Sequence, residues 1–118
     1  MTQAIEGKHI LLAEDDELVA FTVEDILLHA KAGSLTMAAS VREALRILEN
    51  GSFDLAIVDI NLNGEASWPV ATELRRLGIP YLSVTGYGDM LDHELVTALL
   101  PKPYSMQQLL KATAALVS

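Results

Sequence analysis

The sequence predicts a single α/β domain built on a parallel, doubly wound β-sheet. Five short apolar runs alternate with amphipathic stretches along the 118 residues, and this alternation is typical of strands joined by crossover helices. Hydrophobic residues make up 51% of the chain and charged residues 20%, as in globular proteins. Since no repeat or linker-like tract interrupts the pattern, one domain over residues 1–118 is expected.

The five apolar runs are the candidate strands. They cover residues 10–13, 35–38, 55–58, 81–84 and 98–100. The first, third and fourth runs are almost uniformly apolar, a pattern typical of parallel strands that are buried on both faces.

The stretches between these runs predict helices. Ser40 and Ser105 each open a capping box, with Glu43 and Gln108 three residues later, and such boxes mark helix starts. Pro69 favours a helix start near Ser67 or Trp68, because proline is tolerated in a first turn. The predicted helices run over 17–31, from 40 to the glycine at 51, from 67 or 68 to 77, and from 105 to 116. A further helix within 89–96 has the weakest pattern.

Charge and composition exclude several classes of function. A net charge of −8 would be repelled by phosphate backbones, so nucleic-acid binding is not expected, whereas a divalent metal ion would suit it. The chain has no cysteine and therefore no disulfide or thiolate chemistry. It has neither a signal-peptide pattern at its start nor an apolar run near the roughly 20 residues of a membrane span. A cytoplasmic protein without membrane contact is expected.

Polar residues follow four of the predicted strands. The acids 14–17 follow the first, Asp59 the third, Thr85 the fourth and Lys102 the fifth. In doubly wound sheets ligands bind beyond the carboxyl ends of the strands, so these groups are expected to converge. Carboxylates gathered in this way favour a hard dication such as Mg²⁺. Acids after a strand can also simply cap the next helix, and the convergence with the other three strand ends favours the metal site.

The order of acidic pair, lone aspartate, threonine and lysine–proline resembles the receiver domain of bacterial two-component response regulators. The likeness covers essentially the whole chain. It implies a flavodoxin-like fold with strand order 2-1-3-4-5. By the same resemblance Asp59 matches the phosphorylated aspartate and Thr85 the hydroxyl residue. Lys102 matches the family's lysine, whose peptide bond to Pro103 is commonly cis.

The resemblance also implies a Mg²⁺ site. Asp15, Asp59 and the backbone carbonyl of Asn61 would hold the ion, with Glu14 reaching it through a water. Asp16 would be an additional acid at the helix start, where a negative charge suits the helix dipole.

The implied function is that of a single-domain response regulator. It would accept a phosphoryl group on Asp59 from a histidine kinase or a histidine phosphotransfer protein, and signal by protein contact or act as a phosphate sink. It would be a signalling domain, catalysing no more than its own phosphorylation and dephosphorylation. One alternative is a phosphohydrolase of the haloacid dehalogenase type, although that family places its acidic pair last in the chain. Another is a pseudo-receiver, which binds partners without taking phosphate.

Two positions depart from the usual receiver pattern. Receivers usually carry an aromatic switch residue three positions before the lysine, and here Leu99 stands there. Residues 83–87 resemble the Phe-Ala-Thr-Gly-Tyr signature of a receiver subfamily often found as stand-alone domains. Tyr87 is therefore the expected centre of the conformational switch, together with residues 86–96.

The aromatic and imidazole side chains outside these motifs show no ligand pattern. His9, His29 and His93 lack metal-ligand spacing and are expected to be incidental surface residues. Trp68 is expected to pack at the start of its helix.

Overall fold

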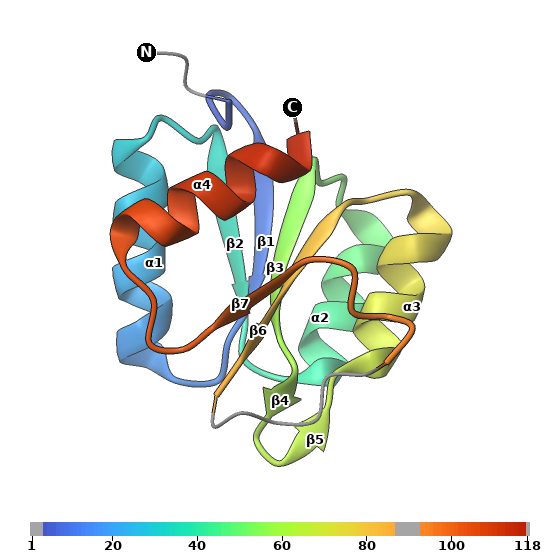
Figure 1. Ribbon diagram of the computed structural model, residues 1–118. Coiled ribbons are helices and arrows are strands. Elements are labelled where there is room, and N and C mark those ends of the chain that lie inside the picture. Colours follow the sequence, from blue (N-terminus) through green and yellow to red (C-terminus); the bar gives the residue numbers. More distant parts are fainter. Residues whose placement is uncertain (1–3, 87–92, 118) are drawn as a thin grey trace.

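The computed structural model, which describes residues 4–86 and 93–117, has one parallel sheet between two helical layers (Figure 1). The strands are β1 (His9–Ala13), β2 (Ser34–Ala38), β3 (Leu55–Asp59), β6 (Tyr81–Thr85) and β7 (Leu99–Pro101). Their order in the sheet is β2-β1-β3-β6-β7, and every neighbouring pair is parallel. The predicted flavodoxin-like architecture and strand order are confirmed.

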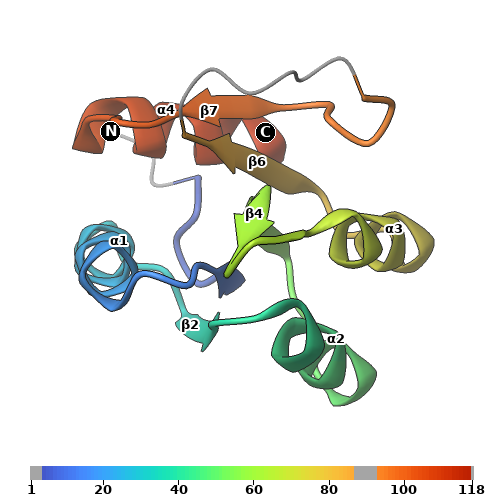
Figure 2. The same ribbon diagram turned by 90° about the horizontal axis from the view of Figure 1, so that it is seen from below.

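In the described part of the chain, four helices cover the two faces of the sheet. They are α1 (Glu17–His29), α2 (Val41–Asn50), α3 (Trp68–Leu77) and α4 (Met106–Val117). Figure 2 shows α1 and α4 on one face and α2 and α3 on the other. Among the residues that the structure describes, no helix is long and apolar enough to cross a membrane.

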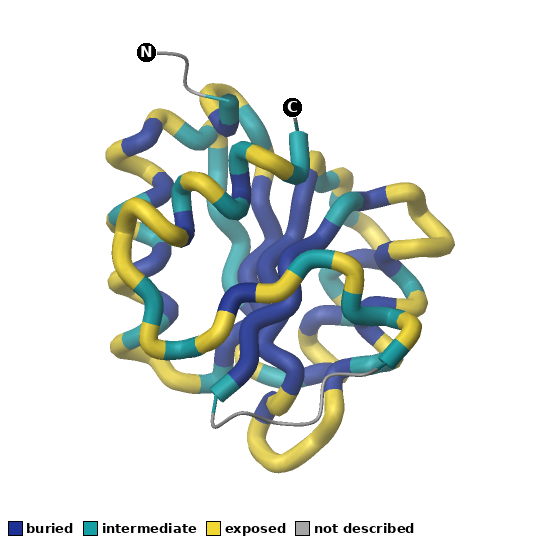
Figure 3. Tube along the Cα trace, viewed as in Figure 1, coloured by how far each residue is buried: buried dark blue, intermediate teal, exposed yellow. Residues whose placement is uncertain are grey.

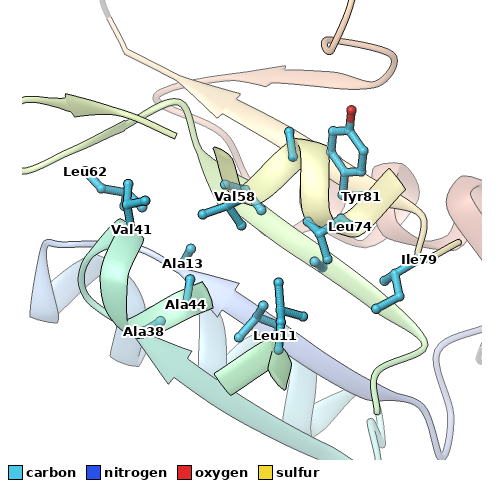
Figure 4. Packing of buried hydrophobic residues seen from close by; sticks show 14 residues of the cluster. Leu11, Ala13, Ala38, Val41, Ala44, Val58, Leu62, Leu74, Ile79 and Tyr81 are labelled. Atoms are coloured by element: carbon cyan, nitrogen blue, oxygen red, sulfur yellow. The ribbon is translucent and has the colours of Figure 1, made fainter. Parts of the chain in front are cut away.

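Two hydrophobic clusters hold the layers together, one on each face of the sheet. Alternate residues of one strand enter different clusters: Leu11 packs toward α2 and α3, whereas Leu12 packs toward α1 and α4. Figure 3 shows β1, β3 and β6 at the centre as mostly buried, and Figure 4 shows Val58, Leu74 and Tyr81 in the α2–α3 cluster. The double burial explains why the runs of β1, β3 and β6 are almost uniformly apolar.

The predicted helix starts are confirmed in detail. The Ser40 hydroxyl accepts a hydrogen bond from the Glu43 N–H, and the Ser105 hydroxyl accepts one from Gln108. Asp16 is the N-cap of α1, with its carboxylate accepting from the N–H groups of Leu18 and Val19.

A small antiparallel hairpin that the sequence analysis does not predict follows β3. It pairs β4 (Asn61–Leu62) with β5 (Glu65–Ala66). Its turn is Asn63-Gly64, with positive φ angles of 54° and 83°. Asn-Gly is the commonest signal for a two-residue hairpin turn with both central φ angles positive, so the signal was present in the sequence.

The helix predicted somewhere within 89–96 does not include the four of these residues that the structure describes. Residues 93–96 form a turn, in which the Val96 N–H donates to the His93 carbonyl at 3.0 Å. Tertiary contacts replace helical ones, since Leu95 packs against the α2–α3 cluster and its carbonyl accepts a hydrogen bond from the Tyr81 hydroxyl. Residues 89–92 and Tyr87 lie outside the described residues.

Candidate functional site

The carboxyl edge of the sheet collects the polar residues that follow its strands, at the lower end of the view in Figure 1. Asp59 is the last residue of β3, and Thr85 is the last residue of β6. Glu14 directly follows β1, and Lys102 directly follows β7. Glu14, Asp59 and Thr85 are buried, each no more than 6% exposed. A chain that buries polar groups in this way needs partners for them.

Lys102 supplies the positive charge at this edge. Its ammonium group lies 2.7 Å from Asp59 Oδ2 and 3.0 Å from Glu14 Oε1. The contacts join residues 43 and 88 positions apart in the sequence, so they exist only because the strand ends meet. The lysine thus neutralises one of two buried carboxylates and leaves an excess of negative charge.

Asp15 adds a third carboxylate to this group. Ligand oxygens of Glu14, Asp15 and Asp59 all lie within 4.8 Å of one another. Three carboxylates facing one ammonium group leave about two negative charges unbalanced, which a dication would neutralise. The donor set, all oxygen, fits Mg²⁺.

The electrostatics of the site are visible in two pKa shifts. Burial raises the pKa of Glu14, and the neighbouring Asp59 raises it further, against the Asp16 N–H and Lys102, which lower it. Burial alone would lower the pKa of Lys102, but its hydrogen bonds to Asp59 and Glu14 outweigh burial and raise that pKa. The lysine is therefore firmly protonated, and the surroundings of Glu14 oppose the ionisation of its carboxyl.

Asp59 is held at both oxygens and faces a cleft. Oδ1 accepts from the Asn61 N–H at 3.0 Å, and Oδ2 accepts from Lys102. The cleft has a volume of about 780 Å³, and its lining includes Asp59, Asn61, Gly86 and Lys102. A small anionic group could therefore reach Asp59 beside the lysine.

Thr85 lies next to the lysine segment. Thr85 pairs with Pro101 in the sheet, and the Thr85 carbonyl accepts a hydrogen bond from the Lys102 N–H at 2.7 Å. Its hydroxyl donates to the Gly86 carbonyl at 3.3 Å. The peptide bond between Lys102 and Pro103 is cis, as the resemblance implied.

Two other residues singled out in the sequence, Leu99 and Asn61, lie at the margin of the site. Leu99 on the edge strand β7 is 37% exposed. The Asn61 side chain accepts a hydrogen bond from the Gly64 N–H at 2.8 Å and so stabilises the hairpin turn. The backbone N–H of Asn61 donates a hydrogen bond to Asp59 Oδ1. The predicted role of its carbonyl as a metal ligand stays a prediction.

Two contacts around the site were not predicted from the sequence. Asp15 Oδ2 accepts from the Asn63 N–H at 2.9 Å, which ties the hairpin turn to the acidic group. Tyr104 is half-buried near the site, where burial, and then the charge of Glu14, raise the pKa of its hydroxyl. The Asn63-Gly64 turn signal could have placed the first contact, whereas no sequence pattern marks the second.

Comparison with known proteins supports one family. The model of the response regulator receiver domain matches residues 10–114. The solution structure of SdrG from Sphingomonas melonis Fr1 is 35% identical, with 100% of both chains covered and a TM-score of 0.77. A comparison with curated proteins finds no match.

Further solved structures share the fold. A putative response regulator from Chloroflexus aurantiacus J-10-fl is 25% identical over 95% of this chain and 98% of that one, with a TM-score of 0.81. A CheY-like receiver domain from Methylobacillus flagellatus is 22% identical over 92% and 98%, with a TM-score of 0.80, and shows the likeness of fold. With the family model matching nearly the whole chain, the protein belongs to the response regulator receiver domain family.

Proposed function

We propose that this receiver domain accepts a phosphoryl group on Asp59 from a phosphohistidine of a histidine kinase or histidine phosphotransfer protein. The observation that carries the proposal is the position of Asp59, which opens on the cleft with Lys102 2.7 Å from one of its oxygens. A carboxylate is a competent nucleophile toward phosphorus when charge is neutralised around it.

The transfer exchanges one bond for another. An Asp59 oxygen forms a bond to phosphorus, and the bond between phosphorus and the donor imidazole nitrogen breaks. The electron pair of the broken bond goes to that nitrogen, which takes up a proton. The products are an acyl phosphate on Asp59 and a neutral histidine.

The residues around Asp59 would orient the phosphoryl group. Lys102 keeps its proton and is placed to donate it in a hydrogen bond to a phosphoryl oxygen. Thr85, at the end of the adjacent strand, is the hydroxyl expected to donate to another oxygen. Both groups act by position and charge, the contributions that dominate phosphoryl transfer.

A magnesium ion fits the acidic group. Asp15, Asp59 and the Asn61 carbonyl would hold it, with Glu14 through a water, as the clustered carboxylates favour. When bound, it would supply two positive charges against those of the transferred phosphoryl group. Asp15 is the least buried of the three acids, so its carboxylate is the most accessible to an ion that arrives from solvent.

The experiment is incubation with Mg²⁺ and acetyl phosphate, followed by intact mass spectrometry. The wild-type chain should gain the mass of one phosphoryl group and the Asp59→Asn variant none. A pseudo-receiver would gain none in either case. A phosphohydrolase would release phosphate from many phosphomonoesters with turnover, and membership of the receiver family speaks against that alternative.

The output of the domain would be a contact with another protein, or removal of phosphoryl groups from a shared kinase. With a net charge of −8, direct binding to nucleic acid is disfavoured. Phosphorylation would change the surface shown to partners by shifting the population of two conformations.

A further inference from the structure

The sole tryptophan of the chain stacks on a histidine that lies 25 positions later. The ring centroids of Trp68 and His93 are 3.9 Å apart, and the ring planes differ by 8°. His93 is therefore not an incidental surface residue, and Trp68 packs on a segment beyond its own helix. The stack joins the first residue of α3 to the segment 93–97, which leads into β7.

The segment 93–97 follows the side of α3 through several other contacts. The Tyr81 hydroxyl donates to the Leu95 carbonyl, and the Arg75 guanidinium donates to the Glu94 carbonyl at a long 3.4 Å. Leu95 packs on the α2–α3 cluster. Figures 1 and 2 both show this orange segment beside α3. The stack is the contact at its N-terminal end.

The Trp68 side of the stack is connected to the candidate site. Trp68 follows Ser67, which is buried and whose N–H donates to the Ile60 carbonyl at 2.8 Å, directly after Asp59. A movement of the end of β3 would therefore act on the Trp68 side of the stack.

Phosphorylation of Asp59 would change the contacts at the end of β3. In the unmodified chain, Asp59 Oδ1 accepts from the Asn61 N–H and Oδ2 accepts from Lys102. Once one of these oxygens is bonded to phosphorus, its charge passes to the phosphoryl group, and the hydrogen bond on that side has to be remade with the new group. One ring stack is a weak contact by comparison with charge-assisted hydrogen bonds.

We propose that the Trp68–His93 stack is a conformational latch, which holds the segment 93–97 against α3 in the unphosphorylated chain and opens when Asp59 is phosphorylated. The proposal rests on the proposed function, since it names where that event reaches the surface. Opening would free the His93 ring and expose the N-terminal end of the segment to partners, without an aromatic residue at position 99.

Tryptophan fluorescence measures the latch directly, because Trp68 is the one emitter of its kind. An imidazole ring in van der Waals contact quenches an excited indole, so opening raises the emission. The turn offers two further reporters: the Leu95 N–H donates to His93 Nδ1 and the Val96 N–H donates to the His93 carbonyl, both at 3.0 Å. These amide hydrogens should exchange faster when the latch opens.

The experiment treats one sample with Mg²⁺ and acetyl phosphate and measures intact mass, Trp68 emission and amide exchange together. In the wild type, phosphorylation should raise the emission toward that of the His93→Ala variant and speed exchange at Leu95 and Val96. His93→Ala should start bright and respond no further, while remaining phosphorylated to the same extent. His29→Ala, which removes an exposed histidine on α1, should behave as the wild type.

The outcomes separate the two proposals. A full mass gain with unchanged emission and unchanged exchange at these two amides overturns the latch and leaves the proposed function in place. A mass that does not change overturns both. If His93→Ala is no brighter than the wild type before treatment, the stack does not exist in solution and the latch is wrong.

Discussion

Lys102 Nζ lies 2.7 Å from Asp59 Oδ2, and this ion pair joins the ends of strands that are not neighbours in the sheet. β6 lies between β3 and β7, so the lysine reaches across the end of one strand to its partner. The side chain also contacts Glu14 beyond β3. One cation thus bridges three strand ends.

Replacing Lys102 with methionine should leave Asp59 and Glu14 buried without their cation. The free energy of unfolding at neutral pH should fall by about 1–3 kcal/mol, the usual effect of leaving a buried polar group unpaired. Urea denaturation measures the change. Addition of Mg²⁺ should restore part of the loss, because the ion replaces the missing charge; a variant as stable as the wild type without Mg²⁺ would contradict this.

Asp15 and Asp16 are adjacent but should differ in their effect on Mg²⁺ affinity. Asp15 belongs to the carboxylate group, whereas Asp16 caps α1. Asp15→Ala should weaken Mg²⁺ binding at least tenfold, and Asp16→Ala should mainly lower stability, by about 1 kcal/mol. Calorimetric titration and urea denaturation of both variants check the pair. Equal losses of affinity would show that the two acids have been given the wrong roles.

The stability of the metal-free protein should depend on pH through Glu14. Its folded-state pKa is raised above 4.5, so the folded chain holds this proton more firmly than the unfolded chain does. Stability from this group is therefore present at low pH and lost as the pH rises from about 4.5 through the raised value. The difference in unfolding free energy between wild type and Glu14→Gln, measured in EDTA across this range, should fall with pH. A difference that is independent of pH would contradict the raised pKa.

The hairpin turn should contribute to metal binding through Asp15. Gly64 has a φ of 83°, so Gly64→Ala strains the turn that presents the Asn63 N–H to Asp15. Stability should fall by about 1 kcal/mol, and the affinity for Mg²⁺ should fall as well. Gly78→Ala is the matched control, because Gly78 has a φ of 73° at the end of α3, away from the site. It should cost similar stability and leave the affinity unchanged; parallel effects of both variants on affinity would refute the link.

The strands could be predicted because apolar runs are local patterns in the sequence. The positions of the site residues then followed from the topology of a parallel sheet. Apolar runs predicted β1, β3 and β6, and the topology of a parallel sheet then placed Glu14, Asp59 and Lys102 at one edge. The capping boxes at Ser40 and Ser105 were equally local, and all these elements agree with the structure.

The features that were missed depend on contacts between distant segments. The segment 93–97 contains residues that would tolerate a helix, but Leu95 and His93 find partners on α3 and β6 that a helix pattern does not encode. The Trp68–His93 stack likewise pairs residues without any shared motif. The hairpin is different, since Asn63-Gly64 is a local turn signal in the sequence itself.

Reductive mapping can identify Asp59 as the phosphoryl acceptor without relying on a variant. Borohydride reduces an acyl phosphate of aspartate to homoserine, which marks the acceptor position permanently for peptide mass spectrometry. After treatment with Mg²⁺ and acetyl phosphate, we expect homoserine at position 59 and at no other aspartate. Homoserine at position 15 or 16, or its absence from every position in a chain shown to bind Mg²⁺, would contradict the account.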